Sequence, residues 1–332
     1  MATPFDEVKG QPSAVFALTR ALERDRVAHA YLFEGPSGVG KERAAMALAC
    51  ALLCPTAPRT GCGACPVCLR VREGKHPDVR VVRPRDEGHR NIPVEVVRDE
   101  ILPFAKFAPF EAPAACLIFP EADVSFPVQH AEAANALLKT LEEPRAQLSF
   151  VLLSERPERL LPTIRSRCQS VRFAPLSRAL LHEILAQHGV AENLRDAAVA
   201  LARGRADRAL LLAEEGRAER LLDMALRIDE AVESKRAGAI IDVADDLAGS
   251  EEQDVLLDTL ALFYRDVAHS ALLGDTAPLS FPHKSELLTR RAATLGASRA
   301  AARVQAIETT CEALGRNANP EVAMGAMLFT FA

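Results

Sequence analysis

A glycine-rich segment near the N-terminus, GPSGVGK, has the residue types and spacing of a loop that binds nucleotide phosphates. Glycines let backbone N–H groups turn toward phosphate oxygens, and the lysine adds a full positive charge. Ser or Thr is expected directly after the lysine, because its hydroxyl ligates Mg²⁺, but this chain has Glu42. The candidate nucleotide-binding residues are Gly35, Gly38, Gly40, Lys41 and Glu42. A carboxylate beside a triphosphate is repulsive, so a relic loop that binds no ATP or ADP remains an alternative.

Four of the eight cysteines form a second group that could do chemistry: Cys54, Cys62, Cys65 and Cys68. Two C-x-x-C spacings share Cys65, and Pro and Gly residues between them allow tight turns. Four thiolates suit a tetrahedral Zn²⁺ ion, and four protein ligands leave no position for a catalytic water. The spacing therefore predicts a structural zinc site, with a cysteine-rich loop that binds no metal as the alternative. Cys50, Cys116 and Cys311 are predicted to be core residues.

The acidic residues expected of a working ATPase are incomplete. An apolar run over 115–119 is typical of a buried parallel strand, and a strand of this kind ends on a Mg²⁺-orienting Asp in many nucleotide hydrolases. This chain has Pro120 there, which cannot ligate a metal, followed by Glu121. Without an Asp partner, Glu121 is expected to be a solvated or hydrogen-bonded acid.

The elements that must position these residues alternate between short apolar runs and helical patterns. Strands are predicted over 31–33, 79–82, 115–119, 150–153 and 171–173, and helices over 12–24, 44–54, 92–105, 129–143 and 160–166, with a polar loop over 84–91. Alternation of this kind around a phosphate loop predicts a three-layer α/β core over 1–174.

Strand signals end after Pro175. Three or four short helices fit between 177 and 215, and two longer ones over 216–247 and 251–273. After a loop over 274–282, helical patterns run from 283 to 315, and a last helix begins at Pro320. The break near Gly216 predicts a boundary between a small helical module, 175–215, and a larger bundle, 216–332.

Composition limits the remaining function classes. The 332 residues, 49% of them apolar, suit two or three globular domains. A net charge of −5 gives no overall basic field for nucleic acid, so contact with DNA must come from a local patch or a partner. No apolar run is long enough to span a membrane, and the first residues lack a secretion signal. The expected location is the cytoplasm.

Several segments together resemble the bacterial clamp-loader family, and they extend over most of the chain: HAYLFEGPSGVGKE (29–42), the four cysteines, HPDV (76–79), AANALLKTLEEP (133–144), LLPTIRSRCQ (160–169) and RNANPEVAM (316–324). The resemblance implies an AAA+ P-loop core with a zinc module inserted at about 54–68, a small helical lid domain and a C-terminal all-α collar domain that oligomerises. It also implies gamma/tau and delta subunits as partners, with the sliding clamp and primed DNA reached through the complex.

Within that family, the differences favour a subunit that does not turn over ATP, inside a holoenzyme with DNA polymerase activity. Glu42 and Pro120 replace the expected Mg²⁺ ligands, and Asp207 stands where the motor subunit has a sensor arginine. The resemblance further implies that Arg167, in the Ser-Arg-Cys triplet 166–168, is an arginine finger for a neighbouring subunit's ATP. A plain salt bridge is the alternative role of Arg167, and Arg165 is the competing candidate.

Three other functions remain open at this point: an ATP-hydrolysing gamma/tau-type motor, a P-loop repair or phosphotransfer enzyme, and a scaffold with no nucleotide role. The cysteine cluster and the helical C-terminal half argue against the second. Dependence of ATP turnover on Lys41 would support the first. Failure of Arg167 variants to change a partner's ATPase activity would favour the third.

Overall fold

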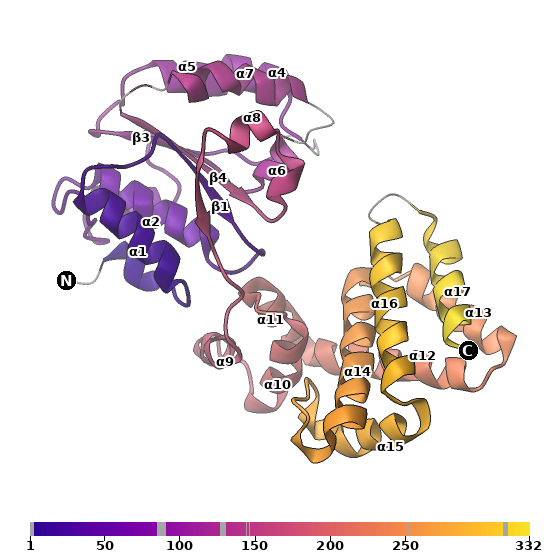
Figure 1. Cartoon of the computed structure of the whole chain (residues 1–332). Helices are drawn as coiled ribbons and strands as arrows, with labels where there is room; N and C mark the ends of the chain where they lie inside the picture. The colour runs from indigo at the N-terminus through magenta and orange to yellow at the C-terminus, as the bar shows by residue number, and fades with distance from the viewer. Residues whose placement is uncertain are drawn as a thin grey trace. The chain divides into compact units, whose positions relative to one another are not determined.

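A computed structural model describes residues 3–84, 91–126, 131–143, 145, 147–250, 252–314 and 318–332. The chain divides into two compact units, Met1–Leu180 and Leu181–Ala332 (Figure 1). The first unit is α/β, and the second is built from helices. Most of the predicted polar loop at 84–91, the first residues of the predicted helix at 129–143, and residues 315–317 lie outside the described residues.

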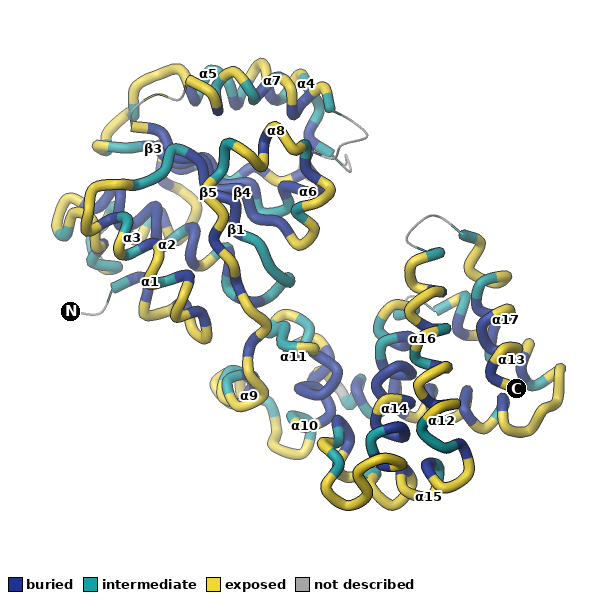
Figure 2. Tube along the Cα trace, viewed as in Figure 1, coloured by how far each residue is buried: buried dark blue, intermediate teal, exposed yellow. Residues whose placement is uncertain are grey.

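The first unit contains one five-stranded parallel sheet. Its strands are β1 (Ala30–Glu34), β2 (Val79–Val81), β3 (Ala115–Phe119), β4 (Leu148–Ser154) and β5 (Gln169–Arg172), in the order β2-β3-β4-β1-β5. The five predicted strands are confirmed. Every residue of β3 and β4 is buried, and so is every residue of β1 except the half-buried Glu34, as the dark blue centre of Figure 2 shows. Because the strands are parallel, the segments that follow β1, β3 and β4 meet at one edge of the sheet.

Helices cover both faces of this sheet, which gives the predicted three layers (Figure 1). One side carries α1 (Pro12–Glu23) and α2 (Lys41–Leu53), with α3 (Pro66–Arg72) and the short η1 (Pro4–Glu7) packed on α2. The other side carries α4 (Val94–Val96), η2 (Val97–Ile101), α5 (Leu102–Lys106) and α7 (Ala131–Glu142). The shorter α6 (Ala122–Ser125), η4 (Pro157–Arg159) and α8 (Pro162–Arg165) lie between strands in the chain.

The predicted helix over 92–105 is present, but it widens in the middle. The amide of Leu102 bonds the carbonyl of Val97, five residues back, and Pro103 follows at the start of α5. Proline lacks the N–H that the next helical hydrogen bond would need. The wider turn over Val97–Ile101 lies directly before Pro103, where the regular bonding pattern is interrupted.

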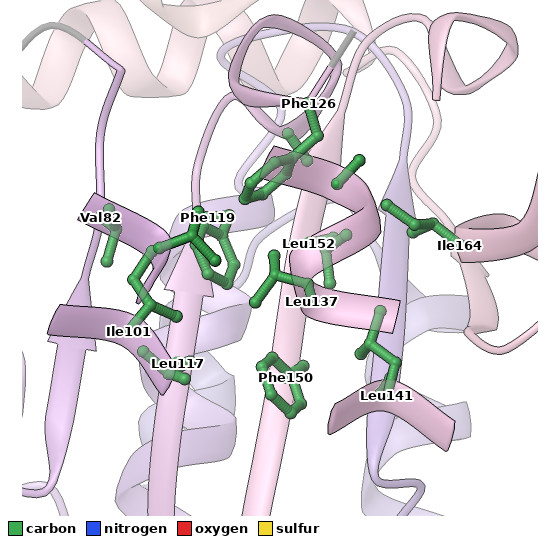
Figure 3. Packing of buried hydrophobic residues seen from close by; sticks show 14 of the residues in the cluster. Val82, Ile101, Leu117, Phe119, Phe126, Leu137, Leu141, Phe150, Leu152 and Ile164 are labelled. Atoms are coloured by element: carbon green, nitrogen blue, oxygen red, sulfur yellow. The ribbon is translucent and has the colours of Figure 1, made fainter. Parts of the chain in front are cut away.

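Apolar side chains from the strands and from this helical layer fill the space between them (Figure 3). Leu117, Phe119 and Phe150 of the sheet are fully buried and belong to one cluster with Ile101 and Leu137. Burial of each such side chain is worth roughly 1.5–3 kcal/mol. This packing fixes the strands whose ends carry the candidate site.

The second unit contains α10 (Glu192–Leu201), α11 (Ala206–Leu212), η5 (Glu214–Gly216), α12 (Arg217–Glu233), α13 (Ala237–Ala248), α14 (Gln253–Leu273), η6 (Gly274–Thr276), η7 (Pro282–Lys284), α15 (Ser285–Leu295), α16 (Ala297–Leu314) and α17 (Pro320–Phe331); α9 (Arg178–Gln187) spans the division between the units. The structure describes these helices as one unit, and the division into a lid and a collar at 215/216 stays a prediction. Asn319 caps α17 through its side chain, as expected of the residue before Pro320.

One helix prediction in this unit is wrong in detail. The single helix over 216–247 is two helices, because Lys235, between α12 and α13, adopts a left-handed backbone with φ of 53°. The helical patterns predicted over 283–315 are confirmed as α15 and α16, which are separated at Gly296, where φ is 76°. A residue with positive φ cannot continue a right-handed helix.

Candidate functional site

The phosphate loop lies where the sequence predicts it, between the end of β1 and the start of α2. Gly35 has φ of 148°, and a Cβ there would lie 2.3 Å from the carbonyl oxygen of Phe173, so no other residue fits without movement. Gly40 also has positive φ, 98°, at the first turn of α2. Lys41 is only 7% exposed, and its ammonium donates to the carbonyls of Gly35 and Pro36 at 2.5 Å each. The lysine therefore lies inside its own loop.

Glu42 has a partner that the sequence prediction missed. Its carboxylate accepts a bond from the guanidinium of Arg83 at 2.5 Å. Arg83 comes two residues after β2, at the carboxyl edge of the parallel sheet. An ion pair thus stands at the position that follows the loop lysine, where a hydroxyl would ligate Mg²⁺. The positive charge screens the repulsion that Glu42 would exert on phosphates.

The strand that precedes Pro120 ends where the sequence predicts. Pro120 directly follows the strand, and the backbone carbonyl of Glu121 accepts amides of α6. The next acid, Asp123, is 7% exposed and accepts the amide of Arg156 at 3.2 Å. Its carboxylate therefore holds the turn after β4. Ser154, the last residue of β4, bonds the same amide through its hydroxyl.

A buried glutamine ties the phosphate loop to the chain that leaves β5. Gln11 is 3% exposed, and its amide nitrogen donates to the carbonyls of Val39, 3.1 Å away, and Ala174, 2.7 Å away. The amide of Ala174 returns a bond to the Gln11 oxygen at 3.0 Å. Because Gln11 and Ala174 are 163 residues apart, this contact could not be found from sequence spacing.

Arg167 lies at the opposite end of the sheet from the phosphate loop. It precedes β5 by two residues, and Gln169 of β5 pairs with Tyr31 near the start of β1, whereas the loop begins after Glu34. Four residues of strand span roughly 13 Å. Arg167 is therefore not brought together with Lys41 of the same chain.

The Arg167 guanidinium is bound at the surface by two acceptors. One nitrogen donates to the carbonyl of Thr163 at 2.8 Å, and another pairs with the Glu142 carboxylate at 2.5 Å. About a third of its side chain is exposed, and Glu142 is about half exposed. The salt bridge considered from the sequence is thus present, and an exposed pair of this kind is worth at most about 1 kcal/mol.

Asp207, the residue expected in place of a sensor arginine, lies in the first turn of α11 in the second unit. It pairs with Arg205 at 3.2 Å and accepts the amide of Arg208 at 2.7 Å. Arg208 in turn pairs with Asp258 at 2.7 Å.

The four predicted cysteines converge on one point. Their sulfur atoms all lie within 4.8 Å of one another. The Cys54 sulfur is 3.6 Å from that of Cys62 and 3.8 Å from that of Cys65. Cys54 directly follows the last residue of α2, and the Cys65 side chain caps α3 by accepting the amide of Cys68. Gly61 and Gly63, both with positive φ, make the turns that bring the two helices' cysteines together. These four sulfurs form a candidate metal centre.

Backbone amides surround these sulfurs. Amide bonds, chiefly from Ala64 and Cys65, lower the pKa of the Cys62 thiol to about 6, whereas burial raises the pKa of Cys68. Cys50, whose sulfur bonds the Cys68 carbonyl, and Cys116 are buried as predicted. The prediction for Cys311 is wrong, because it lies exposed on α16.

In the sheet, β1 lies between β4 and β5, and the phosphate loop follows β1. This strand order and the helices on both faces define an AAA+ P-loop core. The family described as "DNA polymerase III, delta subunit" matches residues 10–177. DNA polymerase III subunit delta' of Bacillus subtilis is 32% identical over 261 residues, 77% of this chain and 77% of that protein. The chain belongs to this family of DNA polymerase III delta-prime subunits.

Three further similarities were found. Subunit delta' of Pseudomonas aeruginosa is 40% identical over 146 residues, 44% of this chain and 43% of that protein. DNA polymerase III subunit tau of Escherichia coli is 35% identical over 196 residues, 58% of this chain and 29% of that protein. A solved gamma subunit-related protein of Thermotoga maritima covers 95% of this chain and 97% of its own, with a TM-score of 0.46 and 16% identity. Among the helices the structure describes, none is long and apolar enough to cross a membrane.

Proposed function

We propose that this chain is the delta-prime subunit of a bacterial DNA polymerase III clamp loader and acts in the cytoplasm in the loading of the sliding clamp onto primed DNA. Its partners are the gamma/tau and delta subunits, and it reaches the clamp and the DNA through the complex. Family membership supports this proposal. The main observation in favour of a delta-prime subunit over an ATP-hydrolysing motor is the Glu42–Arg83 ion pair beside the loop lysine.

The subunit does not hydrolyse ATP by itself. Phosphoryl transfer depends on Mg²⁺ held by protein oxygens and on cations that neutralise charge at the γ-phosphate. Glu42 is engaged by Arg83, Pro120 offers no ligand, and Asp207 is an acid bonded to Arg205. Gly35 and Gly40 keep the positive φ of a phosphate loop, so weak ATP or ADP binding without turnover is compatible with these contacts, provided that Lys41 exchanges its carbonyl partners for phosphates.

The gamma/tau-type motor is the second candidate, because tau subunits share 35–36% identity with more than half of this chain. The residues Glu42, Pro120 and Asp207 argue against a motor, because each stands where an ATPase needs a metal ligand or a cation. An ATPase assay on the isolated chain separates the two candidates.

Arg167 completes a neighbour's ATP site. Its distance from its own phosphate loop and its partial exposure support an action in trans. A guanidinium is always charged and presents a planar fork of donors that suits a phosphoryl group. The ion pair with Glu142 holds the side chain near the surface and, being exposed, costs little to exchange for a phosphate.

The cysteine cluster holds one structural Zn²⁺ ion. Tetrahedral Zn–S bonds of about 2.3 Å require sulfurs about 3.8 Å apart, and the 3.6 and 3.8 Å separations of Cys54 from Cys62 and Cys65 fit this. Bound zinc would offset two of the four thiolate charges and join α2 to α3. Arg72 of α3 pairs with Glu7 at 2.8 Å, so the module also supports the N-terminal segment.

Co-expression with the gamma/tau and delta subunits of the same organism tests the proposed function. We expect a stable complex that contains this chain and loads clamps, and we expect loading to fail when the chain is omitted. A chain that does not enter the complex, or a complex that loads clamps equally well without it, would contradict the proposal.

A further inference from the structure

The two most exposed large hydrophobic side chains among the described residues lie three positions apart. Phe107 is 73% exposed and Phe110 is 83% exposed. Both belong to the segment 106–112, here termed the aromatic loop, which begins at the last residue of α5 and continues toward β3; it is mostly exposed in Figure 2. Apolar groups of this size do not face water without cost, so their display needs an explanation other than packing.

The aromatic loop is held in place by a buried acid. Asp78, 2% exposed, precedes β2, and its two carboxylate oxygens accept the amides of Phe110, Glu111 and Ala112, the last two at 3.0 and 2.9 Å. Bonds from amides to a charged acceptor are the stronger kind. The rings therefore project from a backbone that is already ordered, which lowers the entropy cost of binding a partner.

Two cationic side chains lie at the start of the loop. Lys106 is its first residue, and Arg145 donates to the Lys106 carbonyl at 2.9 Å. The one acid of the loop, Glu111, pairs with Arg70 at 2.5 Å and lies 3.1 Å from His76. Lys106, Arg145 and Arg70 outnumber the acids Asp78 and Glu111 at this loop by one charge, although the whole chain carries −5.

We propose that the aromatic loop binds single-stranded nucleic acid, with bases stacked on Phe107 and Phe110 and phosphates beside Lys106 and Arg145. Exposed aromatic faces on an ordered support with adjacent cations are the elements of a stacking platform for single strands. A protein interface of ordinary size would need a central cluster of apolar anchors with few charges. The aromatic loop instead has Lys106, Glu111 and two separate rings, and charge complementarity favours a polyanion.

Fluorescence anisotropy tests the proposal with the full chain at up to about 100 µM, the range of weak non-specific binding. The probes are labelled dT20, rU20 and a 20-base-pair duplex. We expect both single strands to bind more tightly than the duplex. Preference for dT20 or for rU20 would identify the source of the strand.

Phe107→Ala and Phe110→Ala should each weaken binding of dT20 by about 5- to 150-fold, since one stacked base is worth about 1–3 kcal/mol. Phe16→Ala is the matched control, because Phe16 is 65% exposed on α1. Lys106→Ala and Arg145→Ala should each make the plot of log affinity against log salt shallower by about 0.7.

Three results would overturn the proposal: no binding of single strands by the wild-type chain, equal binding by the Phe107→Ala and Phe110→Ala variants, or equal weakening by Phe16→Ala. If the loop variants instead bind dT20 normally and fail to assemble with the gamma/tau and delta subunits, the loop is a protein interface. Circular dichroism confirms that each variant is folded. The proposed function as a loader subunit does not depend on this outcome.

Discussion

Replacement of Arg303 by methionine should selectively destabilise the helical unit. Arg303 of α16 is 5% exposed and donates to Asp229 at 3.2 Å, to Glu233 at 2.8 Å and to the Phe331 carbonyl at 2.6 Å. Its guanidinium also lies over the rings of Tyr264 and Phe331, 5.1 and 5.4 Å from their centroids. These contacts join α12, α14, α16 and α17.

The size of the effect follows from what remains after the substitution. Removing one partner of a buried ion pair costs about 3–5 kcal/mol. Asp229 keeps Arg291 at 2.8 Å and the Tyr264 hydroxyl at 2.9 Å, so the lower end, about 3 kcal/mol, is expected. For a unit of about 150 residues, this lowers the midpoint of its thermal transition by about 6–12 °C.

Differential scanning calorimetry of the full chain measures this shift, with Arg290→Met as the control that removes an exposed arginine from α15. The transition of the α/β unit should stay where it is. An Arg303→Met protein that unfolds at the same temperature as Arg290→Met would refute the stabilising role assigned to this network.

Three further predictions concern pH, metal and nucleotide. Arg291 and Arg303 lower the pKa of Glu233 from 4.5 to about 2, so its ionised form stabilises the folded state above pH 4.5, and this stabilisation is lost as the pH falls toward 2. The urea midpoint of unfolding should therefore fall less between pH 6 and pH 3 in Glu233→Gln than in wild type. Burial raises the pKa of Asp266, but this residue is present in both proteins and does not affect the difference between them. Equal falls of the midpoint in the two proteins would contradict this prediction. Metal analysis of purified protein, freed of loosely bound metal on a chelating resin, should give about one zinc per chain. Cys65→Ser should lose the zinc and much of the stability of the module, because metal binding contributes directly to folding; disulfides in place of zinc would exclude the site. The isolated chain should show no steady-state ATP hydrolysis, and turnover that disappears with Lys41→Ala would instead establish the motor.

Four strands of the core could be predicted from sequence because each is a short, mainly apolar run bounded by Gly, Pro or polar residues. The fifth, β5 (Gln169–Arg172), has one buried residue, Val171, so only its second half falls within the predicted strand over 171–173. The cysteine cluster could be predicted for a similar reason, since its chemistry is encoded by local spacing. The break between α12 and α13 was missed because Lys235 adopts positive φ without a Gly or Pro signal. Local patterns report conformations only where the residue type restricts them.

The partners of the site residues could not be predicted, because they depend on tertiary structure. Arg83 meets Glu42 only once β2 is placed in the sheet, 41 residues along the chain. The Arg167–Glu142 pair joins the end of α7 to the turn before β5. Gln11 and Ala174 come together across almost the whole α/β unit. Composition and spacing contain no information on such contacts.

The central claim, that this subunit acts on a neighbour's ATP through Arg167, is tested most directly by clamp- and DNA-stimulated ATP hydrolysis of the assembled loader containing Arg167→Ala. An arginine finger is worth roughly 10³–10⁵ in rate at the site it serves, and one site among several should be affected, so we expect an intact complex with a partial loss of hydrolysis and clamp loading. Glu142→Gln, which removes the partner of the ion pair and leaves the arginine, should behave as wild type. Wild-type rates with Arg167→Ala, or the same loss with Glu142→Gln, would contradict the claim.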